Sequence, residues 1–265
     1  MAVIVMTSAP GSPGVTTMAL ALSLTWPRDV LLADCDREPS QAVLAGYLRG
    51  LDAGGRGLAS VAQLHREGRS LQEELLRQSV PLTEGEDTKR RYLPGFSHPA
   101  AVRLFDGVWH GLGEAFEMLD SQGVDVIIDA GRVGSNGLPG GLCIAADLVL
   151  LVSRSTLRSL AATKLHLPIL KEQVAGLATE TPLGMMIVAP TKPYSSQEIA
   201  KLFQIPVWSE IPDNSRAAEV LLEGSAEPRR FREQLFMATV RGQAKALHER
   251  LEKHRSQREA VLAHA

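Results

Sequence analysis

Residues 10–17, Pro10-Gly11-Ser12-Pro13-Gly14-Val15-Thr16-Thr17, are the stretch that decides the fold. They follow a short apolar run at residues 2–6 and lead into a helical pattern over residues 16–24, which Trp26-Pro27 ends. Small residues between a strand and a helix let backbone amides close around an anion at the positive end of the helix dipole. The stretch therefore predicts a phosphate-binding loop, with an ordinary strand-to-helix turn as the alternative.

The rest of the chain alternates apolar runs with helical patterns. We predict further strands at residues 29–33, 124–128, 147–152, 183–189 and 205–208. Helices are predicted over residues 58–78 (one or two), 99–119, from 155 onward, 196–203, and from near Pro228 to the end. Residues 54–57 are predicted as a flexible joint, residues 83–91 as a surface loop, and the glycine-rich residues 131–141 as a mobile loop.

Continuous apolar strands that alternate with helices predict the fold class. We expect an α/β fold, a single doubly wound and mostly parallel sheet with helices on both faces. Residues 1–225 are assigned to this domain, and residues 226–265 to a C-terminal helix that packs on it or extends from it.

The composition fits one intracellular domain. The 265 residues are 45% hydrophobic, which is enough for one sizeable core. The 28 basic and 30 acidic residues argue against a dedicated nucleic-acid binder, because such proteins usually carry a basic excess. Cys35 and Cys143 form neither a disulfide framework nor a CxxC metal site, as expected in a reducing cytoplasm. The chain shows no basic leader and no apolar run near the ~18 residues of a membrane span, so we predict a soluble cytoplasmic protein.

Three aspartates stand at the ends of predicted strands. Asp34 and Asp36 follow the apolar run at residues 29–33, and Asp129 follows the run at residues 124–128. In open α/β sheets, ligands bind beyond the carboxyl ends of the strands, where residues 10–17 also lie. An aspartate after an apolar strand is typical of the Walker B pattern, which orients Mg²⁺ through water. The alternative is that strand-end aspartates cap helices or face solvent in loops.

The loop lacks a residue that a full Walker A motif contains. That motif places a lysine next to its Ser/Thr to reach the β- and γ-phosphates, and Val15 occupies this position. Thr16 stands where the Mg²⁺-binding hydroxyl belongs, and Thr17 can reach another phosphate oxygen. Losing a charge-assisted contact costs about 1.5–3 kcal/mol, so the sequence predicts weak nucleotide binding and inefficient hydrolysis. Arg37 and Arg132 stand beside the aspartates, and they either replace the missing charge or are solvated loop arginines.

An ordered set of segments extends the pattern beyond the loop: GSPGVTT, VLLADCDREPSQ, DVIIDAGRVG, ADLVLLVSRSTLRSL and IPVWSEIPDNSRAAEVLLEG. This set resembles the ParA/MinD family of P-loop ATPases over residues 1–225. It is most similar to the divergent actinobacterial MinD-like proteins, and the pilus-assembly members of TadZ/CpaE type are a further relative. The resemblance implies ATP and Mg²⁺ as ligands and a homodimer formed face to face around the bound ATP.

The same resemblance implies roles for the loop. The family's deviant Walker A motif carries two lysines, and their positions are Pro10 and Val15 here, so both lysines are absent. The first of these lysines reaches across the dimer to the partner's phosphates, which Pro10 cannot do. The nucleotide-binding positions are then Gly11, Ser12, Pro13, Gly14, Val15, Thr16 and Thr17.

The strand-end residues also receive roles by resemblance. Asp36 matches the family's water-positioning aspartate and is the predicted catalytic residue. Pro190 stands where the family commonly has an adenine-contacting asparagine, and Asp213 lies in a segment that often flanks the base, so both are predicted nucleotide-binding positions. The predicted Mg²⁺ site, reached mostly through water, consists of Thr16, Asp34 and Asp129.

The last predicted helix is amphipathic. Its apolar stripe consists of Phe231, Leu235, Val240, Ala244, Leu247 and Leu251, and basic residues lie among them. MinD-like proteins use such a helix at membranes, where it lies in the interface. The alternative, which we favour, is a surface helix that packs its stripe on the sheet. The cytoplasmic assignment therefore includes a peripheral position at the membrane or cell pole.

Three functions are compatible with these observations. The first is a ParA/MinD-like adaptor with weak or absent ATP hydrolysis that positions a partner such as a pilus, secretion or polar machine. The second is a working ATPase switch in chromosome or plasmid partitioning. The third is an interaction module that binds no nucleotide. Direct nucleic-acid binding is not favoured, because nothing in the sequence concentrates basic charge.

Overall fold

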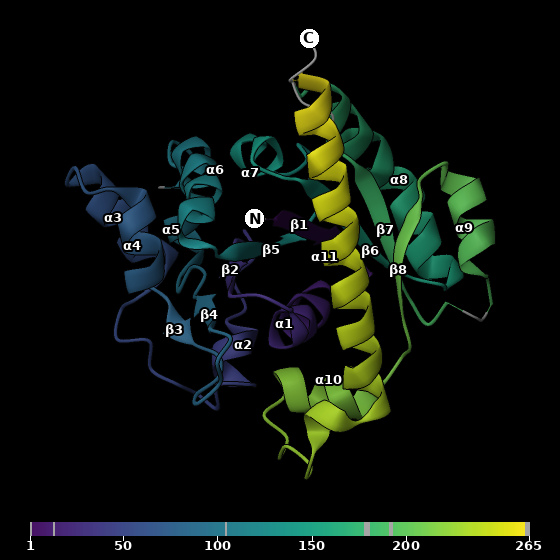
Figure 1. Cartoon of the computed structure of the whole chain (residues 1–265), viewed down its shortest axis with the longest axis horizontal. Coiled ribbons are helices and arrows are strands. Elements are labelled where there is room, and N and C mark those ends of the chain that lie inside the picture. Colours follow the sequence, from purple (N-terminus) through teal and green to yellow (C-terminus); the bar gives the residue numbers. More distant parts are fainter. Residues whose placement is uncertain (1, 13, 104, 178–180, 191–192, 263–265) are drawn as a thin grey trace.

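A central β-sheet organises the chain (Figure 1). The structure is a computed structural model that describes residues 2–12, 14–103, 105–177, 181–190 and 193–262. Among these residues the sheet has eight strands in the order β3-β4-β2-β5-β1-β6-β7-β8, and only β3 runs antiparallel to its neighbour. The strands are β1 Val3–Ser8, β2 Val30–Asp34, β3 Val80–Pro81, β4 Arg90–Leu93, β5 Asp125–Arg132, β6 Leu148–Arg154, β7 Leu183–Val188 and β8 Val207–Ile211.

Helices cover both faces of the sheet, and the strands alternate between two apolar clusters. In β1, Val3 and Val5 join the cluster under α3 to α9, whereas Ile4 and Met6 join the cluster under α1, α2, α10 and α11. The helices are α1 Val15–Thr25, α2 Ala42–Ala45, α3 Leu58–Arg66, α4 Leu71–Arg77, α5 Pro99–Arg103, α6 Trp109–Met118, α7 Gly140–Ile144, α8 Leu157–Ala175, α9 Ser196–Phe203, α10 Ser215–Leu222 and α11 Leu235–Leu262, with 3₁₀ turns at Leu119–Gln122 and Phe231–Glu233. The predicted fold class, a doubly wound and mostly parallel α/β sheet, is confirmed.

Strand β4 corrects the sequence prediction. Residues 83–91 were expected to form a surface loop, but Arg90 and Arg91 belong to a strand that pairs with β2. Their charge hid the strand, and their guanidinium groups bind neighbouring parts of the chain. Arg91 Nε donates to Ser79 Oγ at 2.6 Å and Arg90 Nη2 donates to the carbonyl of Trp26 at 3.1 Å. The predicted loop at residues 131–141 is also shorter than expected, since β5 extends to Arg132 and α7 begins at Gly140.

The C-terminal helix packs on the domain. Helix α11 begins at Leu235, after the turn Phe231–Glu233, and therefore later than the predicted start near Pro228. Figure 1 shows it as the long yellow helix, and it contacts α1 and β8. Leu235 is 82% exposed and does not belong to the buried stripe, which instead consists of Phe236, Met237, Val240, Ala244, Leu247 and Leu251. This stripe lies in the core, as the packing interpretation expected. In the described part of the chain, no helix combines the length and apolarity that crossing a bilayer requires.

A buried carboxylate ties this helix to the sheet. Asp125, at the start of β5, is fully buried and accepts the backbone N–H of Ala2 and the indole N–H of Trp26, each at 2.8 Å. Arg28 Nη1 lies 3.6 Å from its carboxylate, and so does His248 Nε2 of α11. The His248 and Trp26 rings meet edge to face with centroids 5.7 Å apart. One side chain therefore connects β1, the end of α1 and α11.

Candidate functional site

The loop between β1 and α1 has a backbone that glycine permits. Gly11 has φ 77° and Gly14 has φ 119°, values that residues with a side chain rarely adopt. The N–H of Ser12 donates to the carbonyl of Ala9 at 3.0 Å, and the N–H of Met18 donates to that of Gly14 at 2.9 Å. Gly14 is thus the N-cap of α1, whose free amides and dipole favour an anion. The predicted position Pro13 lies outside the described residues.

Two hydroxyls at this loop are buried and unpaired. Ser8, at the end of β1, and Ser12, within the loop, are each 1% exposed. Among the described residues neither Oγ atom has a hydrogen-bond partner. An unsatisfied buried hydroxyl costs about 1–3 kcal/mol, and a bound anion or water would remove this penalty. The two unpaired hydroxyls therefore support a phosphate site independently of the glycines in the loop.

The structure brings the predicted Mg²⁺-binding residues together beside the loop. Asp34 and Asp129 are paired in register on β2 and β5, and they are 7% and 2% exposed. Tyr92 donates its hydroxyl to Asp34 Oδ2 at 2.9 Å, and the N–H of Gly131 donates to Asp129 Oδ1 at 2.9 Å. The hydroxyl of Thr16, in the first turn of α1, lies close enough to Asp129 to oppose the rise in the pKa of that carboxyl group.

Burial and mutual repulsion make these carboxyl groups weak acids. Burial, reinforced by the charge of Asp34, raises the pKa of Asp129 from 3.8 to about 7. Burial likewise raises the pKa of Asp34 from 3.8 to about 6, against the hydrogen bond from Tyr92. The pKa of Asp36 is also raised, mainly by burial. The raised pKa values indicate that too little positive charge lies near these carboxyl groups to stabilise their ionised forms. A divalent cation would supply that charge.

The donor set fits Mg²⁺ held largely through water. Carboxylate and hydroxyl oxygens are ligands that this ion prefers, and it usually keeps several waters. Within the described ranges no cluster of three or more His, Cys, Asp or Glu side chains is arranged to hold a metal directly. Thr16 would then bind the ion directly together with phosphate oxygens, whereas Asp129 and Asp34 would act on its waters.

Two glycines that the sequence reasoning did not single out make room for the carboxylates. A β-carbon on Gly95 would lie 2.7 Å from Asp34 Cγ, and one on Gly131, whose φ is +61°, would overlap the carboxyl group of Asp36. The N–H of Asp36 donates to Asp34 Oδ1 at 3.2 Å, so the two acids are linked. In the sequence, the only indication of this packing was that Gly131 lies two residues after Asp129.

Replacing Gly131 with alanine is expected to destabilise the chain by at least about 1–2 kcal/mol, because the left-handed conformation is strained with a side chain. The overlap with Asp36 adds to this cost, so the double variant with Asp36→Gly should lose less stability than the sum of the two single changes. Urea denaturation measures both effects. Gly85→Ala is the matched control, since Gly85 also has a positive φ of 69° and its β-carbon meets open space. Equal costs for Gly131→Ala and Gly85→Ala would contradict the proposed close approach.

The two arginines considered as replacements for the Walker lysine, Arg37 and Arg132, bind other parts of the chain. Arg37 Nη2 donates to the carbonyl of Gly137 at 2.6 Å, and Arg132 Nη1 lies 3.4 Å from a carboxylate oxygen of Glu38. Both charges oppose the upward shift in the pKa of Asp36, so they lie near that acid. Gly137 and Glu38 belong to the loops after β5 and β2, not to residues 10–17.

The predicted base-binding positions lie further along the same edge of the sheet. Val188 of β7 and Ile211 of β8 are paired in register. Pro190 lies two residues after Val188, and Asp213 lies two residues after Ile211. Asp213 forms an ion pair with Arg154, the last residue of β6. The structure therefore pairs Asp213 with Arg154, a residue that the sequence did not indicate.

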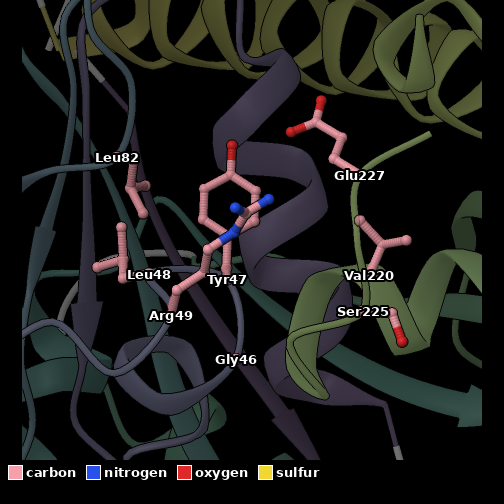
Figure 2. A pocket seen from close by; sticks show the side chains of 8 residues that line it. All are labelled: Gly46, Tyr47, Leu48, Arg49, Leu82, Val220, Ser225 and Glu227. Carbon is pink, nitrogen blue, oxygen red and sulfur yellow. The ribbon is translucent and has the colours of Figure 1, made fainter. Parts of the chain in front are cut away.

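A pocket of about 230 Å³ lies apart from this site (Figure 2). It is lined by Tyr47, Leu82, Val220 and their neighbours, and none of the predicted site residues lines it. Figure 2 shows the Tyr47 ring in the middle of the group, and its hydroxyl accepts a 2.9 Å hydrogen bond from Arg232 Nη2. This pocket therefore gives no support to the nucleotide assignment.

Comparisons with known proteins bear on the fold. The chain matches no protein-family model and no curated protein sequence. Solved structures that are similar include a ParA family ATPase from Chlorobium tepidum TLS, with 18% identity, TM-score 0.71, and 92% of this chain and 98% of that chain covered. The MinC:MinD cell division protein complex of Aquifex aeolicus has 17% identity, TM-score 0.68, and 94% and 96% coverage. The septum site-determining protein MinD of Pyrococcus horikoshii OT3, complexed with Mg-ADP, has 20% identity, TM-score 0.65, and 92% and 94% coverage.

These similarities extend over almost the whole chain and over almost the whole of each solved structure. They agree with the mostly parallel eight-stranded sheet of this chain. The chain has the α/β P-loop fold of the ParA/MinD-family ATPases.

Proposed function

We propose that this chain is a ParA/MinD-like adaptor that binds Mg-ATP weakly at the loop of residues 10–17 and hydrolyses it slowly or not at all. The observation that carries the proposal is the cluster of Thr16, Asp129 and Asp34 beside a loop with an unpaired buried hydroxyl on Ser12. The solved relative from Pyrococcus horikoshii that contains Mg-ADP supports the choice of ligand.

Each residue has a physical role in this proposal. The amides at the start of α1 and the small residues of the loop hold the phosphates. Thr16 and the carboxylates of Asp34 and Asp129 hold Mg²⁺ and its waters, and the ion supplies the charge that neutralises phosphate oxygens. Asp36, which is only partly buried, is the residue to which we assign the positioning of the attacking water.

The missing lysine is expected to slow hydrolysis more than it weakens nucleotide binding. Val15 is 7% exposed and packs in the apolar cluster between α1 and the sheet, so it offers no charge to a phosphate. Phosphoryl transfer depends on electrostatic stabilisation of the developing charge. Amides and Mg²⁺ can hold the ground state, but slow turnover is expected without a cation in the Val15 position.

Restoring that cation is the sharpest test of the proposal. Val15→Lys is expected to strengthen Mg-ATP binding by about 10- to 100-fold, the value of one charge-assisted contact. Wild-type phosphate release should stay near background. Calorimetric titration and a phosphate-release assay measure the two effects, and Val15→Met is the control of similar length without charge. Rapid wild-type turnover that falls on Asp36→Ala would instead show a working ATPase switch.

The adaptor part of the proposal concerns partners. We infer a homodimer and a protein partner, of the pilus, secretion or cell-pole class that the actinobacterial MinD-like and TadZ/CpaE-like resemblance implies. The MinC:MinD complex supports the idea that a chain of this fold binds another protein. Membrane attachment through α11 is not favoured, because its apolar stripe is buried against α1 and β8.

A further inference from the structure

One arginine outside the predicted site lies against the phosphate loop. Arg158 is in the first turn of α8, which follows β6, the strand next to β1. A β-carbon on Gly11 would lie 3.8 Å from Arg158 Nε. The loop that lacks its lysines therefore has a guanidinium group beside it, contributed by a different helix.

This guanidinium is free to bind an anion. Arg158 is exposed, and it makes no hydrogen bond or ion pair with the residues that the structure describes. By contrast, Arg154 is paired with Asp213, and Arg132 with Glu38.

The position of Arg158 is unfavourable unless an anion is present. A cation in the first turn of a helix faces the positive end of the helix dipole. The N-terminus of α1 also points to this edge of the sheet, so positive potential from α1, α8 and Arg158 converges on the loop. The buried, unpaired hydroxyl of Ser12 lies next to Gly11 in the same loop. These two observations independently indicate an anionic ligand at this place.

We infer that Arg158 supplies, within the same chain, the positive charge for the nucleotide phosphates that the absent loop lysines would provide. This inference rests on the proposed function, because it assumes that Mg-ATP binds at residues 10–17. Arg158 is then a phosphate-binding residue that reaches the loop from α8, and the loop needs no cation from a partner subunit for binding.

The test compares the affinities of the full-length chain for Mg-ATP, Mg-ADP and AMP by calorimetric titration. Arg158→Ala is expected to weaken Mg-ATP binding by about 10- to 100-fold, which corresponds to one charge-assisted hydrogen bond. AMP binding should change least, because AMP has the fewest phosphate oxygens near the loop. Arg158→Lys should retain most of the affinity, and Val15→Lys added to Arg158→Ala should restore it.

Lys164→Ala is the matched control, since Lys164 is an exposed cation on the same helix and its loss changes the net charge equally. Wild-type binding with an unchanged Arg158→Ala variant overturns this inference and leaves the proposed function intact. Equal losses in Arg158→Ala and Lys164→Ala also overturn it, because they indicate a general charge effect. A wild-type chain that binds neither Mg-ATP nor Mg-ADP overturns both proposals.

Discussion

Replacing Asp129 with asparagine is expected to stabilise the metal-free chain at pH 8 and to abolish its stabilisation by Mg-ATP. The pKa of Asp129 is raised by burial from 3.8 to about 7, so the folded chain keeps a proton that the unfolded chain releases. The protonated Asp129 therefore contributes its full stabilisation below about pH 4. This contribution is lost as the pH rises from there through about 7. The loss above pH 7 is on the order of 2–4 kcal/mol. Asparagine carries no charge and still accepts the hydrogen bond from Gly131.

Urea denaturation in EDTA at pH 5 and pH 8 measures this effect. The wild type should lose stability between the two values, and Asp129→Asn should lose less. Asp106→Asn serves as a control, because Asp106 is exposed in the loop before α6. A variant that is no more stable than the wild type at pH 8, or that Mg-ATP stabilises equally, would show that Asp129 is not the group described.

Replacing Asp125 with alanine is expected to cost about 3–5 kcal/mol of folding free energy, as is usual when a buried charge network loses one partner. The change leaves the Ala2 N–H and the Trp26 indole N–H without an acceptor, and it removes the carboxylate that faces Arg28 and His248. Hydrogen exchange should increase in α11 in particular, because His248 belongs to that helix. Asp125→Asn, which keeps one acceptor, should cost less.

The matched control for this variant is Asp120→Ala. Asp120 pairs with Arg255 at 2.9 Å, but both side chains are about 40% exposed, so its loss should cost no more than about 1 kcal/mol. If Asp125→Ala and Asp120→Ala cost the same, the buried carboxylate does not hold α11 on the domain.

Most of the strands that could be predicted are buried on both faces. The runs in β1, β2, β5 and β6 consist almost entirely of apolar residues, because helices cover each side of a parallel sheet. Strand β4 was missed because it begins with Arg90 and Arg91, whose side chains bond to nearby backbone carbonyls. Helix α10 was not among the predicted helices, although Asn214 caps it.

The residues of the candidate site also divide into those that the sequence could indicate and those that depend on the fold. Asp34, Asp36 and Asp129 could be found because each follows an apolar strand, and parallel strands bring their carboxyl ends together. Tyr92 and Gly95 depend on the pairing of β4 with β2, which the sequence did not indicate. Arg158 depends on the direction in which α8 leaves β6, so a local pattern cannot place it beside Gly11.

The most direct test of the account is calorimetric titration of the wild-type chain with ATP at pH 8, where Asp129 is ionised, in Mg²⁺ and again in EDTA. The account predicts saturable binding of one nucleotide per chain in Mg²⁺, with a dissociation constant of about 10 μM to 1 mM. It also predicts that EDTA weakens this binding strongly and that Asp129→Asn removes the Mg²⁺ dependence. Absence of saturable heat with both Mg-ATP and Mg-ADP up to millimolar concentration would contradict it and leave a P-loop fold that serves only as an interaction module.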